Sequence, residues 1–448
     1  MIYRITKPQK ACFDVYLPPS KSISNRAFVL NALTGAQMGL VNNVSDCDDT
    51  TVLMEALFLL DMERREGAAC MMPPVVDVRA AGTAMRFLTA LMAVTPGTHT
   101  IKGTERMHQR PIGILVEALR TLGAQIEYLG EEGFPPLRIT GSKLRGGTLE
   151  LEGSVSSQFI SALLMIAPRL KGDLTLHLTG EIVSRPYIDM TLAMMNEHGA
   201  KASWKDEQTL FVKAKPYKAT PYTVEADWSA ASYWYEMVLL SKDAYQTATL
   251  KGVFAKSLQG DSAVADLFRQ LGVQSMFLSS MEDLPKVALR RLGQLPKRVE
   301  WDFTATPDLA QTMVVACALK GIPFRFTGLQ SLRIKETDRI KALEVELAKL
   351  GVSLEVEGDS VISWPGPEAQ KALTFPYLQP PTGTFIETYK DHRMAMAFAP
   401  ASLVLGSIDI FDPEVVTKSY PRFWDDLRQA GFGVEEIQND RDTKQRPF

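Results

Sequence analysis

The sequence predicts an α/β protein with two similar domains, each built from three repeats of a strand–helix–strand–helix–strand unit. A chain of 448 residues is long enough for two or three domains with a sizeable core. Six apolar segments are each followed by a polar break and a short strand rich in Val, Ile, Thr and Phe. A second helical segment follows each of them and usually ends at a glycine. Units this long are not solenoid repeats, so six of them indicate two domains of three repeats each.

The first helical segments are apolar nearly all round, which predicts that they are buried. With the strands that follow them, they span residues 25–44, 82–103, 156–180, 229–252, 307–328 and 392–413.

The second helical segments are amphipathic, and we expect them to pack outside the first or to face solvent. In one of them Ile340, Leu343, Leu347 and Leu350 share a helix face, and Gly351 stands where a helix-ending glycine belongs. These segments and their strands span residues 110–130, 185–204, 262–278 and 339–358, with 48–60 and 420–437 less clear.

Composition excludes several classes of protein. The net charge of −3 indicates no overall basic field for nucleic acid, so any anion site must be local. The five histidines lack metal-ligand spacing, and neither a metal nor a cofactor is expected. The four cysteines show no CxxC spacing, no stretch is long and apolar enough to span a membrane, and the first ten residues lack the apolar core of a signal peptide. We therefore expect a cytoplasmic protein with reduced thiols.

Polar residues gather where the predicted helices begin. Ser229, Ser257, Asp48 and Asp49 are expected to be helix caps, a role that contributes about 1 kcal/mol each. A cation at a helix N-terminus is instead unfavourable by roughly 0.3–1 kcal/mol, because it faces the positive end of the dipole. Cations nevertheless stand at or near these positions: Lys21, Arg26, Arg110, Arg185, Lys335, Arg339, Arg393 and Lys418. This pattern predicts a site for several anionic groups, with Asp308 and Glu336 available to move protons.

Seven segments resemble, in order, the signatures of the 5-enolpyruvylshikimate-3-phosphate synthase family. They are "PPSKSISNRA", "AAGTAMRFLTA", "ERMHQRPIGILVEALR", "GSVSSQFISALLM", "VSRPYIDMTL", "IKETDRI" and "YKDHRMAMAF", and they extend over nearly the whole chain. The resemblance implies two domains of three βαβαββ units each, an inside-out α/β arrangement with the active site in the cleft between them. It places residues 19–226 in the shikimate 3-phosphate domain, and residues 1–18 and 227–448 in the other.

The resemblance also implies the reaction. The 5-hydroxyl of shikimate 3-phosphate adds to C2 of phosphoenolpyruvate while C3 is protonated, and loss of a C3 proton and of phosphate leaves the enol ether. The implied catalytic residues are Glu336 for the C3 proton, Asp308 as a candidate base for the 5-hydroxyl, and Lys21, which touches both substrates. The implied partners are these two small-molecule substrates. We expect the protein to be a monomer.

The resemblance implies two overlapping sets of contacts. For phosphoenolpyruvate they are Lys21, Gly82, Arg110, Gln158, Arg339, Arg393 and Lys418. For shikimate 3-phosphate they are Lys21, Ser22, Arg26, Ser156, Ser157, Gln158, Ser184, Tyr187, Asp308, Ser331 and Lys335. On a helix, Lys335 and Arg339 would share a face and Glu336 would be turned by about 100°.

Three positions depart from the family pattern. Ala80 replaces an Asn near phosphoenolpyruvate, Phe87 stands where Pro or Leu is usual, and Ser331 stands where some members have Asn. These changes bear on affinity more than on the reaction. Because Gly82 is retained, we expect glyphosate to inhibit by competing with phosphoenolpyruvate.

The sequence leaves two alternative functions to consider. The nearest is the sister enzyme that transfers enolpyruvyl to UDP-N-acetylglucosamine, which usually carries a reactive Cys on a mobile loop. Neither Cys47 nor Cys70 lies in such a loop motif. A non-catalytic anion-binding relative would be expected to have lost one of Lys21, Asp308 or Glu336, and all three are present.

Overall fold

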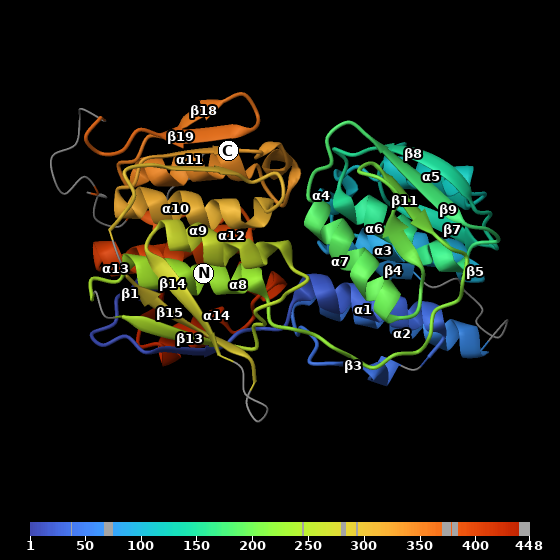
Figure 1. Cartoon of the computed structure of the whole chain (residues 1–448), viewed down its shortest axis with the longest axis horizontal. Coiled ribbons are helices and arrows are strands. Elements are labelled where there is room, and N and C mark those ends of the chain that lie inside the picture. Colours follow the sequence, from blue (N-terminus) through green and yellow to red (C-terminus); the bar gives the residue numbers. More distant parts are fainter. Residues whose placement is uncertain are drawn as a thin grey trace. The chain divides into compact units, whose positions relative to one another are not determined.

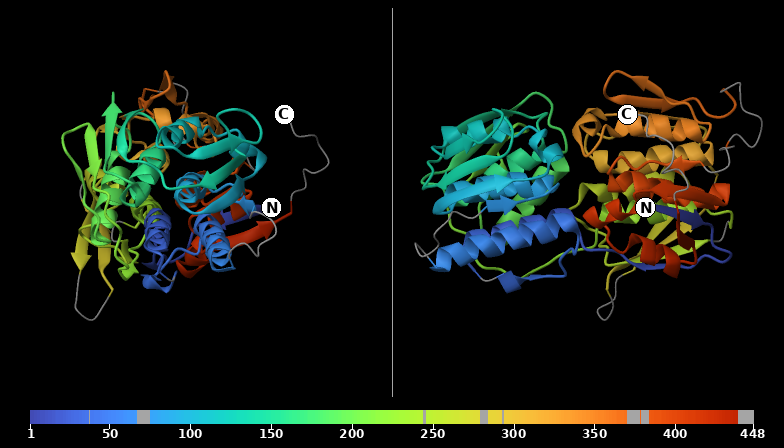
Figure 2. Two further views of the ribbon diagram at one scale, coloured as in Figure 1. Left: turned by 90° about the vertical axis from the view of Figure 1, so that its right-hand side faces the viewer. Right: turned by 180° about the vertical axis from the view of Figure 1, so that it is seen from behind.

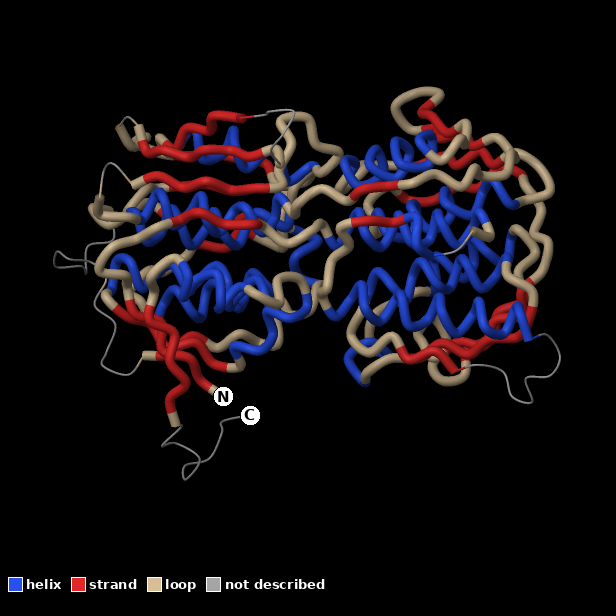
Figure 3. Tube along the Cα trace, turned by 90° about the horizontal axis from the view of Figure 1, so that it is seen from below, coloured by secondary structure: helices blue, strands red, loops and turns tan. Residues whose placement is uncertain are grey.

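The chain divides into two compact units in a computed structural model. Unit 1 comprises residues 1–18 and 226–448, and unit 2 comprises residues 19–225. The structure describes residues 1–36, 38–66, 75–243, 246–278, 284–292, 294–369, 378 and 384–438. Cys70 lies outside these residues. Each unit contains helices surrounded by small sheets (Figure 3).

Unit 1 has a core of first helices from the three repeats. All residues of α12 and all but Lys320 of α10 are buried, as the apolar composition of these segments predicts. Burying one such large apolar side chain contributes roughly 1.5–3 kcal/mol. The helices of unit 1 are α8 (Trp228–Leu240), α9 (Val264–Gln270), α10 (Ala310–Lys320), α11 (Arg339–Lys349), α12 (His392–Phe398), α13 (Ser402–Leu405) and α14 (Phe423–Gln429). Short 3-10 helices are η4 (Gly260–Ala263), η5 (Pro307–Leu309), η6 (Gln330–Ile334), η7 (Ala399–Ala401) and η8 (Pro413–Lys418).

Three four-stranded sheets flank these helices in unit 1 (Figure 1). The first has the order β14 (Val273–Leu278), β15 (Lys286–Arg291), β13 (Thr247–Lys251), β2 (Phe13–Tyr16). The second has the order β16 (Val299–Asp302), β17 (Phe324–Thr327), β19 (Val361–Trp364), β18 (Glu355–Glu357). The third has the order β20 (Phe385–Ile386), β21 (Ser407–Phe411), β1 (Ile2–Thr6), β22 (Gly433–Ile437).

Unit 2 repeats the plan. Its helices are α1 (Lys21–Thr34), α2 (Asp48–Glu66), α3 (Gly82–Val94), α4 (Glu105–His108), α5 (Gly113–Thr121), α6 (Ser157–Ile166) and α7 (Arg185–Glu197), with 3-10 helices η1 (Met38–Leu40) and η3 (Ala167–Arg169). One sheet has the order β4 (Val75–Asp77), β5 (Gly97–Lys102), β7 (Leu137–Gly141), β6 (Gln125–Tyr128). Another has the order β10 (Ala202–Trp204), β11 (Thr209–Val212), β9 (Leu174–Thr179), β8 (Gly147–Glu152).

The repeat that contains α1 and α2 shows fewer strands among the described residues than the other five. Among the described residues its sheet holds only β12 (Tyr222–Thr223) and β3 (Val41–Asn42), which pair in parallel. The other five sheets share one pattern, in which the first two strands are parallel and the last two add antiparallel, as in β8, β9, β11 and β10. Among the described residues, five repeats therefore show a four-stranded sheet, and the repeat that contains α1 and α2 shows a two-stranded one.

Two N-terminal strands complete sheets of unit 1. β1 lies between β21 and β22, where the earliest residues of the chain meet the latest ones (Figure 2). β2 pairs in parallel with β13. The chain passes from unit 1 to unit 2 at Pro18–Pro19 and returns at Glu225–Ala226, so Ala226 belongs to unit 1 rather than to unit 2 as the sequence placed it. Within the part of the chain that the structure describes, no helix is long and apolar enough to cross a membrane.

Candidate active site

Charged residues gather in unit 1 at the N-termini of three helices, α10, α11 and α12. Asp308 lies in η5 just before α10, Asp391 caps α12, and Arg339 is the first residue of α11. The other members of this group are Lys335, Glu336, Arg393 and Lys418. We call these seven residues the charged cluster.

Arg339 is the centre of the charged cluster. Its side chain is only 2% exposed, and each of its three nitrogens donates to a different carboxylate. Nε lies 2.7 Å from Asp391 Oδ2, Nη1 lies 3.0 Å from Asp308 Oδ1, and Nη2 lies 3.0 Å from Glu336 Oε2. Burial alone would lower the pKa of Arg339, but the three carboxylates outweigh it and raise the pKa above its ordinary value.

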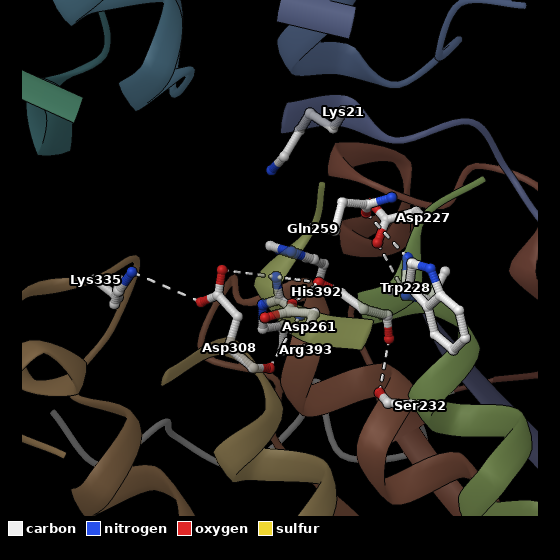
Figure 4. A network of polar contacts seen from close by, with 12 residues as sticks. Lys21, Asp227, Trp228, Ser232, Gln259, Asp261, Asp308, Lys335, His392 and Arg393 are labelled. Atoms are coloured by element: carbon white, nitrogen blue, oxygen red, sulfur yellow. Dashed lines mark hydrogen bonds and ion pairs between the residues drawn. The ribbon is translucent and has the colours of Figure 1, made fainter. Parts of the chain in front are cut away.

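Asp308 is surrounded by cations. Besides Arg339, its carboxylate lies 3.0 Å from Arg393 Nη2 and 3.6 Å from Lys335 Nζ (Figure 4). Burial would raise the pKa of Asp308, yet Arg393, Lys335 and Arg339 together hold it well below its ordinary value. The carboxylate is therefore ionised at neutral pH. Burial also lowers the pKa of Lys335, against the attraction of Asp308.

Glu336 is held by two cations. Its Oε2 accepts from Arg339, and its Oε1 lies 3.0 Å from Lys418 Nζ in η8. The side chain is 15% exposed. Asp308 and Glu336 thus bind different nitrogens of one guanidinium, which places two candidate proton-transfer groups side by side.

Two sequence expectations about this region are wrong. Lys335 has extended backbone and Glu336 precedes the helix, because Asp338 caps α11 by accepting a hydrogen bond from the Lys341 amide at 3.0 Å. The helical geometry expected for residues 335–339 therefore does not apply, although Glu336 still reaches Arg339.

Ser229 is likewise not a helix cap. Asp227 takes that position on α8 and accepts from the Ala230 amide at 3.1 Å. The Ser229 hydroxyl instead donates to Asp261 and lies 3.5 Å from Arg393 Nη2. Burial, and then the nearby Asp308, raises the pKa of Asp261 from 3.8 to about 7. Asp261 is therefore a further acid beside the charged cluster, and it holds a proton through most of the acidic range.

In unit 2 Lys21 pairs with a carboxylate, whereas the buried Arg26 lies among hydroxyls, carbonyls and aromatic rings. Lys21, the first residue of α1, lies 3.2 Å from Asp49 Oδ2 at the start of α2. Gly82 begins α3, and a Cβ at this position would lie 2.5 Å from Arg110 Nη1. The guanidinium of Arg110 thus lies directly against the first turn of α3, where amide groups point outward.

Arg26 is fully engaged inside unit 2. Its guanidinium donates to the Thr191 hydroxyl at 2.7 Å, the Ser22 carbonyl at 2.9 Å and the Ser161 hydroxyl at 3.2 Å. It also lies over the rings of Phe87 and Tyr187, with Cζ 5.3 and 5.9 Å from their centroids. Burial lowers the pKa of Arg26 to about 10. A direct contact of Arg26 with shikimate 3-phosphate stays a prediction.

The remaining predicted binding residues stand at helix starts or in short turns. Ser156 caps α6 by accepting from the Gln158 amide at 3.3 Å, and the Gln158 side chain donates to Thr83 at 3.1 Å, which joins the starts of α6 and α3. Ser184 precedes α7 with a left-handed backbone, φ 58°. In unit 1 the Ser331 hydroxyl is buried in η6 without a hydrogen-bond partner among the described residues. Ser157 is the first residue of α6.

The sequence interpretation did not place four charged residues in the site, although it named one of them, Asp49, as an expected helix cap. They are Asp49, Arg86, Asp261 and Asp391. Arg86 could have been noticed, because it is a lone cation inside an otherwise apolar helix, where its Nη1 donates to the Gly82 carbonyl at 3.0 Å. Asp391 belongs to the "YKDHRMAMAF" segment, but nothing in the spacing marks it as the partner of a residue 52 positions earlier.

Metal ligation is not evident in the described ranges. In these residues no group of three or more His, Cys, Asp or Glu side chains is arranged to hold a metal ion.

Comparison with known proteins gives one consistent family. The family model described as EPSP synthase (3-phosphoshikimate 1-carboxyvinyltransferase) matches residues 5–427. A Bacteroides fragilis protein named 3-phosphoshikimate 1-carboxyvinyltransferase is 52% identical over 435 residues, which cover 97% of this chain and 99% of that protein. A Methanospirillum hungatei protein of the same name is 34% identical, covering 93% of this chain and 96% of the other.

Solved structures agree on the fold. The EPSP synthase of Acinetobacter baumannii superposes with a TM-score of 0.74 at 20% identity, covering 97% of this chain and all of that one. At this identity the likeness concerns the fold alone.

Proposed function

The chain belongs to the EPSP synthase family, and on that premise we propose that it transfers the enolpyruvyl group of phosphoenolpyruvate to the 5-hydroxyl of shikimate 3-phosphate and releases phosphate. It is thus an enzyme of the shikimate pathway, which supplies chorismate for aromatic amino acids. We propose that it works as a monomer in the cytoplasm. The observation that carries the proposal, beside the family, is the guanidinium of Arg339, which holds Glu336 and Asp308 on adjacent nitrogens.

The cations of the charged cluster support binding of phosphoenolpyruvate, whose phosphate and carboxylate carry nearly three negative charges. In the proposal Arg339, Arg393 and Lys418 bind it from unit 1, and Lys21, Arg110, Gln158 and the Gly82 backbone bind it from unit 2. Arginine suits this task because its planar fork matches a carboxylate or phosphate with two parallel hydrogen bonds.

The serine-rich helix starts support binding of shikimate 3-phosphate. Ser156, Ser157 and Ser184 stand at the N-termini of α6 and α7, where amide groups and the helix dipole favour a phosphate. The proposed set from unit 2 also includes Lys21, Ser22, Arg26, Gln158 and Tyr187. From unit 1, Asp308, Ser331 and Lys335 would hydrogen-bond the hydroxyl groups of shikimate 3-phosphate.

The proton steps follow from how the two acids are held. In the addition step, the 5-hydroxyl oxygen forms a bond to C2 and gives up its proton, while C3 gains a proton. In the elimination step, C3 loses a proton and C2 loses phosphate, which leaves the enol ether. When the anionic groups of phosphoenolpyruvate attract Lys418 and Arg339, Glu336 loses compensating charge and its affinity for a proton increases. Glu336 would then transfer the proton to and from C3. Asp308 would accept the proton of the 5-hydroxyl, and Lys21 would donate a proton to the departing phosphate.

The test is phosphate release from phosphoenolpyruvate in metal-free buffer, with either shikimate 3-phosphate or UDP-N-acetylglucosamine as acceptor. Release with shikimate 3-phosphate alone is expected. Release only with the UDP sugar would assign the sister activity. No release with either acceptor, despite binding of shikimate 3-phosphate in calorimetry, would identify a non-catalytic relative.

A further inference from the structure

The turn just before α12 has an unusual backbone. Tyr389 and Lys390 both have positive φ, 53° and 57°, and the Asp391 amide donates to the Thr388 carbonyl at 2.9 Å. Positive φ at both central residues is the signature of a type I′ turn, which normally selects Gly, Asn or Asp. Because neither residue favours this conformation on its own, surrounding contacts must hold the turn.

The turn sets the position of two members of the charged cluster. Asp391 follows it directly, is fully buried and accepts from Arg339 Nε at 2.7 Å. Asp391 also caps α12 by accepting from the Arg393 amide at 2.9 Å, and Arg393 in turn contacts Asp308. A change of the turn would therefore move the carboxylate that orients Arg339 and the guanidinium that binds Asp308.

The contacts that hold the turn converge on Glu346. This residue lies on α11 and is fully buried. Its Oε1 accepts from the Tyr389 hydroxyl at 2.7 Å, and its Oε2 accepts from the Glu387 amide at 3.1 Å. Lys349 Nζ lies 2.8 and 2.7 Å from the two oxygens, which compensates the charge, and also donates to the Phe385 carbonyl at 3.2 Å.

Helix α11 thus contacts residues 387–391 through two side chains. Arg339 and Glu346 are seven residues, or about two turns, apart on one face of α11. Arg339 holds Asp391, which follows the turn, and Glu346 holds Glu387 and Tyr389, which precede or belong to it.

We propose that Glu346 is a positioning residue for enolpyruvyl transfer: through Tyr389 and the Glu387 amide it holds the left-handed turn that places Asp391 and Arg393 in the charged cluster. This inference rests on the proposed function and concerns the phosphoenolpyruvate side of it. Arg393 is a proposed contact of phosphoenolpyruvate, and Arg339 is another, so the effect should fall on that substrate first.

The experiment compares Tyr389→Phe and Glu346→Gln with the wild-type full chain, with each substrate varied in turn. We expect the KM for phosphoenolpyruvate to rise roughly tenfold, because small displacements of a binding group are costly, and the KM for shikimate 3-phosphate to stay within about twofold. The matched control is Tyr235→Phe. It removes a tyrosine hydroxyl that hydrogen-bonds Ser275 at 2.7 Å in the same unit, away from the turn.

A rescue separates positioning from general stability. Glycine adopts positive φ without steric cost, so Lys390→Gly relaxes the turn without touching Glu346. In the Tyr389→Phe background it should restore most of the wild-type KM for phosphoenolpyruvate. The proposal is overturned if Tyr389→Phe and Glu346→Gln lower the unfolding temperature as Tyr235→Phe does and leave that KM unchanged. Equal rises of both KM values, or no rescue by Lys390→Gly, also overturn it.

Failure of the proposed function would look different, because the wild-type protein itself would then release no phosphate. In that case calorimetric titration of phosphoenolpyruvate into the same variants decides the positioning role. Weaker binding in Tyr389→Phe that Lys390→Gly restores supports it, and equal binding in all variants overturns it.

Discussion

The two units hold buried arginines in opposite ways. In unit 1, Arg339 donates to three carboxylates and Arg393 contacts Asp308. In unit 2, Arg26 is equally buried but its partners are hydroxyls, carbonyls and two aromatic faces. Within the described parts of unit 2, no carboxylate lies within ion-pair distance of Arg26 or Arg110.

The difference lies in what compensates the buried positive charge. A buried cation is tolerated in unit 1 because acids compensate its charge. In unit 2 the desolvation of Arg26 is uncompensated, and its pKa falls to about 10. The two buried arginines therefore differ in whether carboxylates neutralise their charge.

The largest expected effect comes from removing an acid of unit 1. Glu336→Gln keeps the shape of the side chain and can still accept from Arg339, but it cannot exchange the C3 proton. We expect kcat to fall by about 10²–10⁴-fold with little change in the affinity for shikimate 3-phosphate. Single-turnover phosphate release together with calorimetry measures both quantities. A kcat within a few-fold of wild type would assign the proton transfer to another residue.

The next effect comes from changing the geometry of the central cation while keeping its charge. Arg339→Lys leaves one ammonium where three directed hydrogen bonds stood, so at least one of Asp308, Glu336 and Asp391 loses its hydrogen bond to residue 339. We expect kcat/KM to fall about 10²-fold or more.

The matched control for that variant is Arg428→Lys in the same unit. Arg428 pairs with Asp425 at 2.7 Å, and the two side chains are 43% and 64% exposed. Such a pair contributes roughly 0–1 kcal/mol, so activity and urea midpoint should not change. Equal losses of kcat/KM in both variants would mean that replacing any arginine of unit 1 lowers activity. The special role of Arg339 in the charged cluster would then be refuted.

A pH measurement tests Asp261, the buried acid beside the charged cluster. Burial and Asp308 raise the pKa of Asp261 to about 7, whereas in the unfolded chain it is near 4. Its contribution to stability is therefore complete below about pH 4 and is lost as the pH rises through 7. Asp261→Asn removes this loss, so the free energy of unfolding of the variant, relative to wild type, should increase by about 1–3 kcal/mol between pH 5 and 8. A constant difference across that range would show that Asp261 ionises without cost.

A smaller effect is expected in unit 2 from crowding one arginine. A Cβ at Gly82 would lie 2.5 Å from Arg110 Nη1 and 2.9 Å from Arg86 Nη1, so both guanidinium groups must move in Gly82→Ala. We expect the KM for phosphoenolpyruvate to rise roughly tenfold without loss of folding stability. Gly39→Ala is the control, because a Cβ there meets nothing within 4 Å. An unchanged KM would remove Gly82 and Arg110 from the proposed contacts.

The fold was largely predictable because its signals are local and repeated. The buried first helices follow from segments such as 310–319, in which every residue is buried. The pairing of strands was less predictable, since whether a strand joins a sheet depends on partners far away in the sequence. β1 shows this directly: it pairs with β21 and β22, more than 400 residues later.

The site was predictable in its residue types and less so in its pairing. Cations at helix starts indicated an anion site, and Arg339, Arg393, Lys335 and Lys418 do meet in one cluster. The acids that compensate them were only partly foreseen. Asp391 and Asp261 reach the cluster through tertiary contacts that no spacing encodes, and the start of α11 was misplaced because Asp338 is a stronger capping residue than Lys335.

The smallest expected effect separates the two halves of the charge run between Arg333 and Lys341. Lys335, Glu336 and Arg339 belong to the charged cluster, whereas Lys341 is 62% exposed and pairs with Glu344, itself 40% exposed. Lys341→Ala should leave both KM values unchanged and shift the free energy of unfolding by less than about 0.5 kcal/mol, because exposed pairs at this spacing contribute little. Lys335→Ala, six positions earlier, is the informative companion: it removes a cation 3.6 Å from Asp308 and should raise the KM for shikimate 3-phosphate. If the two variants behave alike, Lys335 is not a contact of shikimate 3-phosphate, and among its cations the charged cluster would have to bind its substrates through Arg339, Arg393 and Lys418 alone.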